Sequence, residues 1–385
     1  MKTSSLRIGG LGTTIFAEMS ALAVRTGAVN LGQGFPDTDG PSSVIEAAVD
    51  AMRQGHNQYA PGTGIPALRE AIATHQKHWY GLTVDPATEV AVTTGATEAI
   101  AAALLGLIDP GDEVIVLEPY YDSYVACIQF AGGIRRPVTL RAPDFRLPLD
   151  ELRAAVSPRT TAILLNSPHN PTGTVLTSDE LAAIAAIAVE HDLTVISDEV
   201  YEHLTFDGIV HTPIATLPGM AERTLTISSS GKTFSLTGWK IGWSTGPAPL
   251  VNAMMAAKQF MTYTSGAPFQ PAIAQALGSG PDYFEQFSLG MRDQRDLLCA
   301  GLADIGFDVF IPQGTYFVTT DIRPLGFEDG TEFCLGLPER AGVVAIPHEV
   351  FYDDKAAGRP LVRWAFCKRP EVLIEALDRL QVLRS

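Results

Sequence analysis

The stretch EVAVTTGATEAIAAALLGLIDPGDEVIVLEP, residues 89–119, decides the fold class. It opens with an apolar run at 89–95 that predicts a strand, continues with a helical pattern at 96–108 and turns at 109–111. A second apolar strand follows at 113–119. Because these runs are apolar at successive positions, both faces of their sheet must be covered. The stretch therefore predicts a doubly wound α/β domain with a mostly parallel sheet and helices on each side.

The same alternation continues toward residue 230. Apolar runs that predict further strands lie at 160–168, 193–199 and 223–230. Between the first two lies a helical pattern at 178–192, for which Ser178 is the expected N-cap. These segments extend the predicted parallel sheet and contain no internal repeat.

The pattern changes after residue 280. A charged helix is expected at 284–305, and the runs FDVFIP, GTYFVTTDI, GVVAIP and LVRWAF then predict strands mixed with helices before a last helix at 370–383. We therefore expect three parts. They are an N-terminal segment, 1–40, packed near the small domain, a large α/β domain, 41–280, and a small α+β domain, 281–385.

Composition excludes several classes of protein. The 385 residues are 46% hydrophobic and 18% charged, which is typical of a folded enzyme rather than a disordered chain. With 27 Lys and Arg against 43 Asp and Glu, the formal charge is −16 and no basic run is present. Nucleic acid and anionic lipid are therefore not expected partners.

The cysteines and the apolar segments indicate a cytoplasmic protein. Cys127, Cys299, Cys334 and Cys367 are far apart and form no metal-ligand motif, so reduced thiols are expected and a metal site is not. The start of the sequence lacks the apolar core of a signal peptide, and no run approaches the roughly 18 apolar residues of a membrane span.

The segment SSSGKTFSLTGWKIGW, residues 228–243, contains the most informative lysine. Lys232 follows a predicted strand in a Ser- and Gly-rich turn with aromatic neighbours. An amine in such surroundings is a candidate for Schiff-base chemistry. Taken alone, a lysine in a surface loop is the more common explanation.

Other polar residues follow other predicted strands. Asp198 lies near the end of LTVISDE, followed by Glu199, at the sheet edge where ligands bind in open α/β folds, and its carboxylate could pair with a protonated pyridine nitrogen. Asn170 lies in the rigid turn SPHNPTG, and Gly95 opens a helix whose free N–H groups could hold a phosphate. A helix cap, a solvated acid or a plain turn would explain each of these residues separately.

Together these segments resemble the class I/II aminotransferases, which have fold type I and use pyridoxal 5'-phosphate (PLP). The resemblance covers essentially the whole chain. Its motifs are S-x-x-K-x-F-x-x-x-G-W-K-x-G around Lys232, D-E-x-Y at Asp198, N-P-T-G at Asn170, the turn at Gly95, LGQGFPD at 31–37 and LVRWAFCK at 361–368.

The resemblance implies a role for each matching residue. Lys232 would bind the cofactor aldehyde covalently and then move the proton at the substrate Cα, while Asp198 would keep the pyridine nitrogen protonated. Asn170 and Tyr201 would donate hydrogen bonds to the phenolate oxygen. Tyr121 would stack on the ring, with Tyr120 as the alternative if the register differs by one residue.

The same comparison implies phosphate and substrate contacts. The phosphate would be held by Gly95, Ala96, Thr97, Ser229 and Lys240, where Lys240 stands in place of the arginine of many relatives. Arg363 would bind the substrate α-carboxylate beside Asn170 and the backbone of Gly34. Tyr59 would reach the phosphate of the neighbouring subunit, which implies a homodimer with shared active sites.

The substrate implied is an amino acid and a 2-oxo acid, with two alternatives for the donor. Phrases such as FAEMSALA and GAPFQP are similar to the N-succinyldiaminopimelate aminotransferases of actinobacteria, which act in lysine and cell-wall synthesis. Ser265 and Gly266 stand about where kynurenine and glutamine aminotransferases carry an aromatic residue and a histidine, which predicts a roomier pocket.

The alternative of the same fold is a kynurenine, glutamine or methionine aminotransferase, with a possible β-lyase activity on cysteine conjugates. Two other classes remain. A transcription regulator with an aminotransferase-like domain would need a basic N-terminal module, and only about 40 residues precede the matching region. A binding protein without catalysis would not need Lys232.

Overall fold

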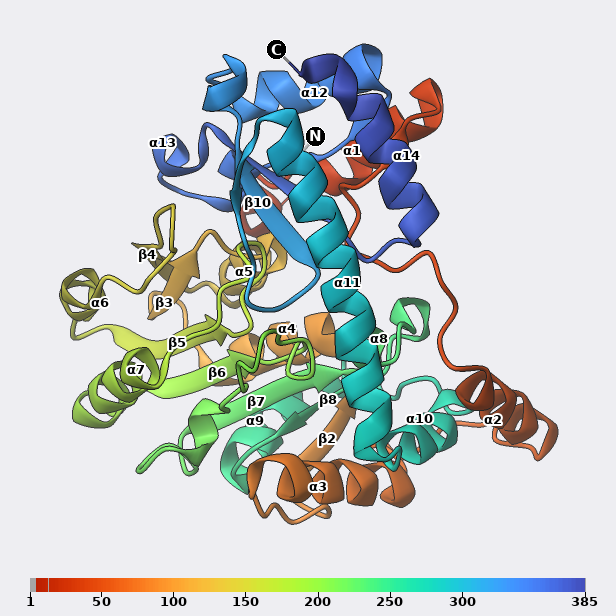
Figure 1. Ribbon diagram of the computed structural model, residues 1–385. Helices are drawn as coiled ribbons and strands as arrows, with labels where there is room; N and C mark the ends of the chain where they lie inside the picture. The colour runs from red at the N-terminus through yellow and green to blue at the C-terminus, as the bar shows by residue number, and fades with distance from the viewer. Residues whose placement is uncertain (1–4, 13, 385) are drawn as a thin grey trace.

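The computed structural model describes residues 5–12 and 14–384, and within them a seven-stranded sheet forms the base of the molecule (Figure 1). Its strand order is β2-β8-β7-β6-β5-β3-β4. β8 runs antiparallel to β2 and β7, and the other neighbouring pairs are parallel. The strands are β2 Val90–Thr93, β3 Glu113–Glu118, β4 Ile134–Thr139, β5 Thr160–Asn166, β6 Thr194–Asp198, β7 Thr224–Ser229 and β8 Gly242–Thr245.

The central strands are apolar at successive positions because alternate residues enter different cores. In β3, Val114 and Val116 face one cluster, whereas Ile115 and Leu117 face the other. The first cluster lies under α4 (Gly95–Leu107), α5 (Asp122–Ala131) and α9 (Ala248–Lys258), and the second under α6 (Leu149–Ala155) and α7 (Ser178–Glu190). The predicted doubly wound, mostly parallel α/β fold is confirmed.

Helix α7 corrects one detail of the prediction. Its N-cap is Thr177, not Ser178, which is the first helical residue. The Thr177 side chain accepts a hydrogen bond from the Glu180 backbone N–H, and the Glu180 carboxylate accepts one from the Thr177 backbone N–H. Threonine followed three residues later by glutamate is the capping-box pattern, which fixes the start of the helix one residue earlier.

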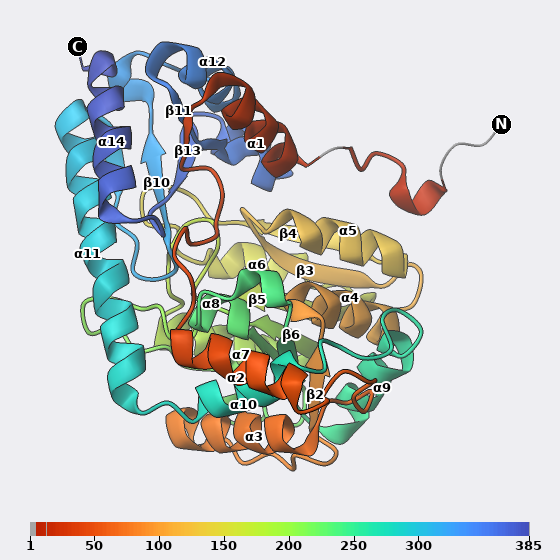
Figure 2. The same cartoon turned by 90° about the vertical axis from the view of Figure 1, so that its right-hand side faces the viewer.

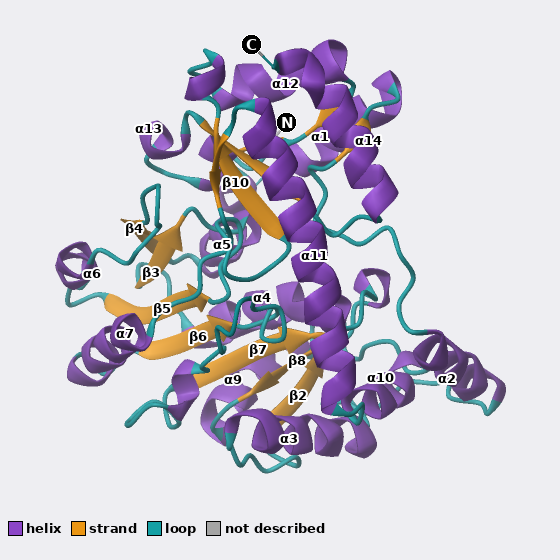
Figure 3. Ribbon diagram, viewed as in Figure 1, coloured by secondary structure: helices purple, strands orange, loops and turns teal. Residues whose placement is uncertain are grey.

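Strands β2 and β8 are covered by a third group of helices. They are α2 (Ser42–Arg53), α3 (Pro66–Tyr80) and α10 (Phe269–Leu277), which lie together beside the lower end of the sheet (Figure 3). α2 and α3 both pack on α10. Among the helices that the structure describes, none combines the length and the apolar character needed to cross a membrane.

A second region contains two small sheets. Strands β12 (Ile346–Pro347), β13 (Leu361–Ala365), β10 (Phe317–Asp321) and β9 (Asp308–Phe310) form an antiparallel sheet in that order, while β1 (Val29–Asn30) pairs with β11 (Val343–Val344) in parallel. The run GVVAIP, predicted as one strand, is thus divided between two sheets. Helices α1 (Ile15–Thr26), α12 (Gly330–Ala341), α13 (Lys355–Gly358) and α14 (Pro370–Leu380) surround these strands.

Two segments connect the regions. The chain runs from α1 and β1 down to α2 (Figure 2), and the long helix α11 (Pro281–Ile305) spans both regions. On α11, Phe284 belongs to the core under α2 and α3, whereas Leu298 and Leu302 belong to the core of the small sheets. The division at residues 40 and 280 stays a prediction, and residues 1–4 and 13 of its N-terminal segment lie outside the described residues.

Candidate active site

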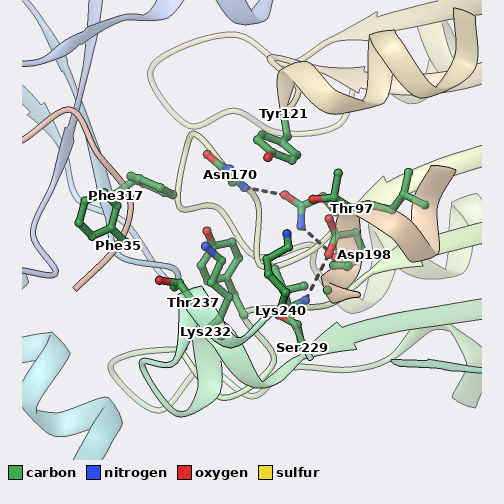
Figure 4. Close-up of a pocket in the computed structure, with 18 of the residues that line it drawn as sticks. Phe35, Thr97, Tyr121, Asn170, Asp198, Ser229, Lys232, Thr237, Lys240 and Phe317 are labelled. Carbon is green, nitrogen blue, oxygen red and sulfur yellow. Dashed lines mark hydrogen bonds between the residues drawn. The ribbon is translucent and has the colours of Figure 1, made fainter. Parts of the chain in front are cut away.

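The carboxyl ends of β2, β5, β6 and β7 lie at one edge of the large sheet and face a cavity of about 370 Å³. Ligands bind at this edge in open α/β folds because the strand exits bring polar loops together there. The cavity is lined by twelve residues predicted from the sequence, namely Gly34, Gly95, Ala96, Thr97, Tyr121, Asn170, Asp198, Tyr201, Ser229, Lys232, Lys240 and Arg363. Figure 4 shows Tyr121 above Lys232 and Lys240, with Asn170 on the left of the site and Asp198 on the right.

Lys232 lies on the one-turn helix α8 (Ser230–Thr233), directly after β7. Its Nζ donates a 2.7 Å hydrogen bond to the Tyr316 hydroxyl oxygen. Burial lowers the pKa of this amine to about 8, and the positive charges of Lys240 and Arg363 add to the shift, while Cys367 and Asp198 oppose it. The amine is therefore a better nucleophile near neutral pH than an exposed lysine.

Asp198 is the last residue of β6 and is only 4% exposed. Burial raises the pKa of its carboxyl group to about 6, although Oδ2 accepts a 2.6 Å hydrogen bond from the Tyr124 hydroxyl. Both the Tyr124 hydrogen bond and the Lys232 charge act in the opposite direction. The cavity therefore contains a buried carboxylate that a cationic ligand would stabilise.

A hydrogen-bonded chain fixes the orientation of Asn170. Its backbone N–H donates to Asn166 Oδ1 at 2.7 Å, and Asn166 Nδ2 donates to the Asp198 carbonyl at 2.9 Å, as the dashed lines in Figure 4 show. The side-chain oxygen of Asn170 accepts a 3.0 Å hydrogen bond from Arg363. Because that oxygen is occupied, the amide NH₂ group of Asn170 remains to donate to a ligand.

Arg363, on β13, is 1% exposed and lies against aromatic rings. Its guanidinium carbon is 4.0 Å from the Phe317 ring centre and 5.1 Å from that of Phe16. One amino group donates to the Gly32 carbonyl at 3.0 Å, and Nε is buried with no partner in the described part of the chain. Burial lowers the pKa of the group to about 10, so the arginine remains a cation at neutral pH.

The start of α4 is built for an anion. Gly95 has φ +73°, and a Cβ added there would lie 3.0 Å from Lys240 Nζ, so glycine leaves room for this ammonium group over the turn. A Cβ at Gly242 would lie 2.8 Å from the Ala96 nitrogen, which explains why β8 can begin directly beside the turn. Backbone N–H groups at a helix start and an adjacent cation together favour a phosphate.

The structure distinguishes two neighbouring tyrosines. Tyr121 lines the cavity and packs edge-to-face on Tyr124, with 5.7 Å between ring centres. Tyr120 instead donates a 2.7 Å hydrogen bond to Asp353, away from the cavity. Tyr121 is therefore the one placed to face a ring.

Tyr59 is the predicted site residue that does not line this cavity. It is 82% exposed and contacts Tyr263 edge-to-face at 5.5 Å. Ser265 also lies outside the lining: its buried hydroxyl is 3.4 Å from the backbone oxygens of Thr93 and Lys240. Tyr59 therefore does not contribute to this cavity in the single chain.

Several lining residues were not predicted from the sequence. They are Phe16, Gln33, Phe35, Ile100, Tyr124, Asn166, Val200, Gly231, Thr237, Ile241 and Phe317. Asn166 could have been found, because it ends an apolar strand as Asp198 does. Phe16 and Phe317 give no such signal, since aromatic residues in a helix and a strand indicate only a core.

Sequence comparison identifies the family. The family described as aminotransferase class I and II matches residues 26–380. The chain is a class I/II aminotransferase. It is 55% identical over 389 aligned positions to a probable N-succinyldiaminopimelate aminotransferase DapC of Mycobacterium tuberculosis, with 98% of each chain covered. It is also 41% identical to a methionine aminotransferase of Escherichia coli, with 97% of this chain and 96% of the relative covered.

Solved structures agree with this assignment. The N-succinyldiaminopimelate aminotransferase from M. tuberculosis superposes on this aminotransferase with a TM-score of 0.97, covering 99% of this chain and all (100%) of that one. YbdL from E. coli, described as having a methionine aminotransferase function, gives a TM-score of 0.95 at 40% identity, with coverage of 99% and 100%. The predicted resemblance to class I/II aminotransferases of fold type I is therefore confirmed.

Members of this family use PLP. The donor set of the cavity fits that group on three observations: a buried amine with a lowered pKa, a buried carboxylate with a raised pKa, and a helix start beside Lys240. An aldehyde, a pyridinium nitrogen and a phosphate would each find the complementary group.

Proposed function

We propose that this aminotransferase binds PLP through Lys232 and transfers an amino group from an amino acid to a 2-oxo acid. The observation that carries the proposal is the placement of Lys232 and Asp198 in one cavity, opposite the helix start at Gly95. When bound, PLP supplies a positively charged ring that stabilises negative charge on the substrate Cα.

The chain's own residues would divide the work. Asp198 would hold the proton on the ring nitrogen, Asn170 and Tyr201 would donate hydrogen bonds to the ring oxygen, and Tyr121 would cover the ring face. Lys232 would take the proton from the substrate Cα and deliver it to the C4' carbon of the cofactor, as amino-group transfer requires. The N–H groups of Ala96 and Thr97, together with Gly95, Ser229 and Lys240, would hold the phosphate.

Substrate binding would depend on Arg363 and Gly34. The guanidinium group would bind the α-carboxylate by a pair of hydrogen bonds, and its unpartnered Nε provides a free donor. A Cβ at Gly34 would lie 2.4 Å from Phe317 Cζ, so only glycine permits the close approach of this segment.

The lysine is tested by comparing two variants. Lys232→Ala should bind PLP without a covalent bond and lose roughly 10²- to 10⁴-fold in turnover, the contribution of a positioned acid–base group. Lys240→Ala should still form a borohydride-reducible adduct on Lys232, with weaker PLP affinity. Absorbance, mass spectrometry of the reduced protein and steady-state rates measure these effects. Full turnover by Lys232→Ala would disprove the assignment.

For the donor, we propose N-succinyl-L,L-diaminopimelate, with 2-oxoglutarate as acceptor, in the lysine and diaminopimelate pathway. The similarity to the M. tuberculosis relative at 55% identity supports this choice. The second candidate is a methionine, kynurenine or glutamine donor, supported by the methionine and kynurenine aminotransferases at 41% and 38% identity.

The cavity offers one observation on this choice. The lysines and the arginine that line it, Lys232, Lys240 and Arg363, already have proposed roles toward the cofactor or the α-carboxylate. None of these three is therefore assigned to the distal carboxylates of the succinylated donor.

Single-turnover rates with each donor, followed by the visible absorbance of the bound cofactor, would rank the candidates. A clear preference for kynurenine or methionine would reject the succinylated donor.

We also propose a cytoplasmic homodimer with shared active sites. Tyr59, Phe260 and Tyr263 are 82%, 86% and 53% exposed, and such exposed aromatic side chains indicate an interface. Mixing Lys232→Ala and Tyr59→Ala proteins should restore activity, because each hybrid dimer regains one site with both native residues. Unchanged activity in verified hybrid dimers would place Tyr59 outside the partner's site.

A further inference from the structure

Tyr316 lies between the reactive amine and the segment that includes Gly34. Its hydroxyl group donates a hydrogen bond to the backbone carbonyl of Gly34 and accepts one from Lys232 Nζ at 2.7 Å. Tyr316 is 1% exposed, and it was not among the residues predicted from the sequence.

These two hydrogen bonds define which way each proton points. A tyrosine hydroxyl has a single proton, and here Gly34 accepts it, so only oxygen lone pairs face Lys232. A neutral amine has two N–H bonds and one lone pair. With one N–H directed to Tyr316, the lone pair is left free to accept a proton from another group.

The tyrosine itself is held firmly. The preceding residue, Thr315, is fully buried with φ +66°, a conformation that L residues rarely adopt, and its N–H donates to the Leu204 carbonyl at 2.9 Å. The Tyr316 carbonyl accepts a 2.9 Å hydrogen bond from the N–H of Phe366. The backbone around Tyr316 is therefore held by contacts with Leu204 and Phe366, and not by the helix that bears Lys232.

We propose that Tyr316 is a positioning residue for proton transfer: it holds the Lys232 amine in one orientation whenever the amine is not bonded to the cofactor. Through Gly34 it also connects the amine to the segment that lies beside the substrate carboxylate. The inference rests on the proposed function, in which Lys232 moves the Cα proton.

The test compares Tyr316→Phe with Tyr352→Phe. Tyr352 is a matched control because it is also 1% exposed and its hydroxyl donates to a backbone carbonyl, that of Leu140, outside the cavity. The substrate is the donor that reacts fastest in the single-turnover comparison proposed above, deuterated at Cα. With it, Tyr316→Phe should slow single-turnover proton transfer about 10- to 100-fold, the effect of misplacing a catalytic group by about 1 Å. The isotope effect should increase and KM should change little. The control should match the native enzyme.

A second readout needs no cofactor. The Tyr316 oxygen accepts a hydrogen bond from the amine and so favours its charged form, which means that Tyr316→Phe should lower the pH at which Lys232 of the apoprotein becomes reactive to an amine label. Mass spectrometry of the labelled peptide at several pH values measures this shift. It remains informative if the variant binds PLP poorly.

The outcomes separate this inference from the proposed function. The positioning role would be rejected by a native proton-transfer rate in Tyr316→Phe, or by an equal loss of this rate in Tyr352→Phe. An unchanged pH profile of Lys232 labelling in Tyr316→Phe would also reject it. If Lys232→Ala is inactive and Tyr316→Phe is normal, only the inference fails. If Lys232→Ala keeps its turnover, the proposed function fails with it.

Discussion

Two buried carboxylates lie four residues apart at the end of β6 and have opposite environments. Asp198 faces the cavity, and burial raises its pKa to about 6. Glu202 faces away from it. Burial acts in the same direction on Glu202, but the hydrogen bonds and charges of His75, His203 and Ser228 outweigh it and hold the pKa well below the usual value.

The partners explain the difference. Glu202 accepts a 2.5 Å hydrogen bond from Ser228, and His75 Nε2 lies 3.9 Å from its other oxygen and 2.9 Å from His203 Nε2. The short nitrogen–nitrogen distance is that of a hydrogen bond between the two imidazoles. Glu202 is thus part of a buried hydrogen-bonded network, whereas Asp198 faces the cavity, where a ligand can supply a further cation.

Of the predictions that test this contrast, Asp198→Asn should have the largest effect. This variant removes the charge that would keep the ring nitrogen protonated, and turnover should fall roughly 10²- to 10³-fold, as when one preorganised electrostatic group is lost. The folded apoprotein should not become less stable, because the native fold disfavours this buried charge. Steady-state rates and thermal unfolding of the apoprotein measure both quantities.

The pH dependence provides the control for Asp198→Asn. A carboxyl with a raised pKa binds its proton more tightly in the folded state, so its contribution to stability falls as pH rises from about 4 to about 6. The variant should therefore gain stability relative to the native apoprotein above pH 6 and not at pH 4. A variant less stable than the native apoprotein at pH 8 would contradict the distinction between the two carboxylates.

The second prediction is that Glu202→Gln lowers the stability of the protein. The matched amide substitution weakens hydrogen bonds to a charged acceptor, and the free energy of unfolding should decrease by about 1–3 kcal/mol. Turnover of the folded enzyme should remain close to native, because Glu202 does not line the cavity. Denaturant unfolding measures the change in the free energy of unfolding. Steady-state kinetics at low temperature measures kcat. A large loss of kcat with native stability would place Glu202 in the reaction.

The position of Asp198 could be predicted from the sequence, but its contrast with Glu202 could not. The apolar strands at 113–119 and 193–199 fix the sheet, and parallel strand ends must meet, so Asp198 and Asn170 are expected at one edge. Glu202 gives no local signal of its different environment, since it lies only four residues after Asp198, the last residue of the same strand. The separation depends on His75, which α3 brings from a distant part of the sequence.

The same reason explains the unpredicted site residues. Tyr316 belongs to a run, GTYFVTTDI, whose pattern predicts only a strand, and its hydroxyl meets Lys232 across 84 residues of sequence. Strand β8 was not predicted, because it begins within the segment at 228–243, which was assigned to cofactor binding. The local sequence pattern predicts helices, strands and the residues at strand ends. Contacts between distant parts of the chain depend on packing, which the local pattern does not show.

The smallest effect concerns the pH dependence of cofactor capture. Only the neutral amine reacts with an aldehyde, and the pKa of Lys232 is lowered to about 8, so the rate of covalent PLP capture by apoprotein should rise tenfold per pH unit below about 7 and level off above about 8. The Asp198 charge favours the protonated amine, so Asp198→Asn should shift this midpoint to lower pH, whereas Glu202→Gln should leave it unchanged. Stopped-flow absorbance measures the capture rate. A midpoint near 10.5, the ordinary value for lysine, would mean that Lys232 is solvated in the apoprotein and that the two carboxylates do not differ in their effect on it.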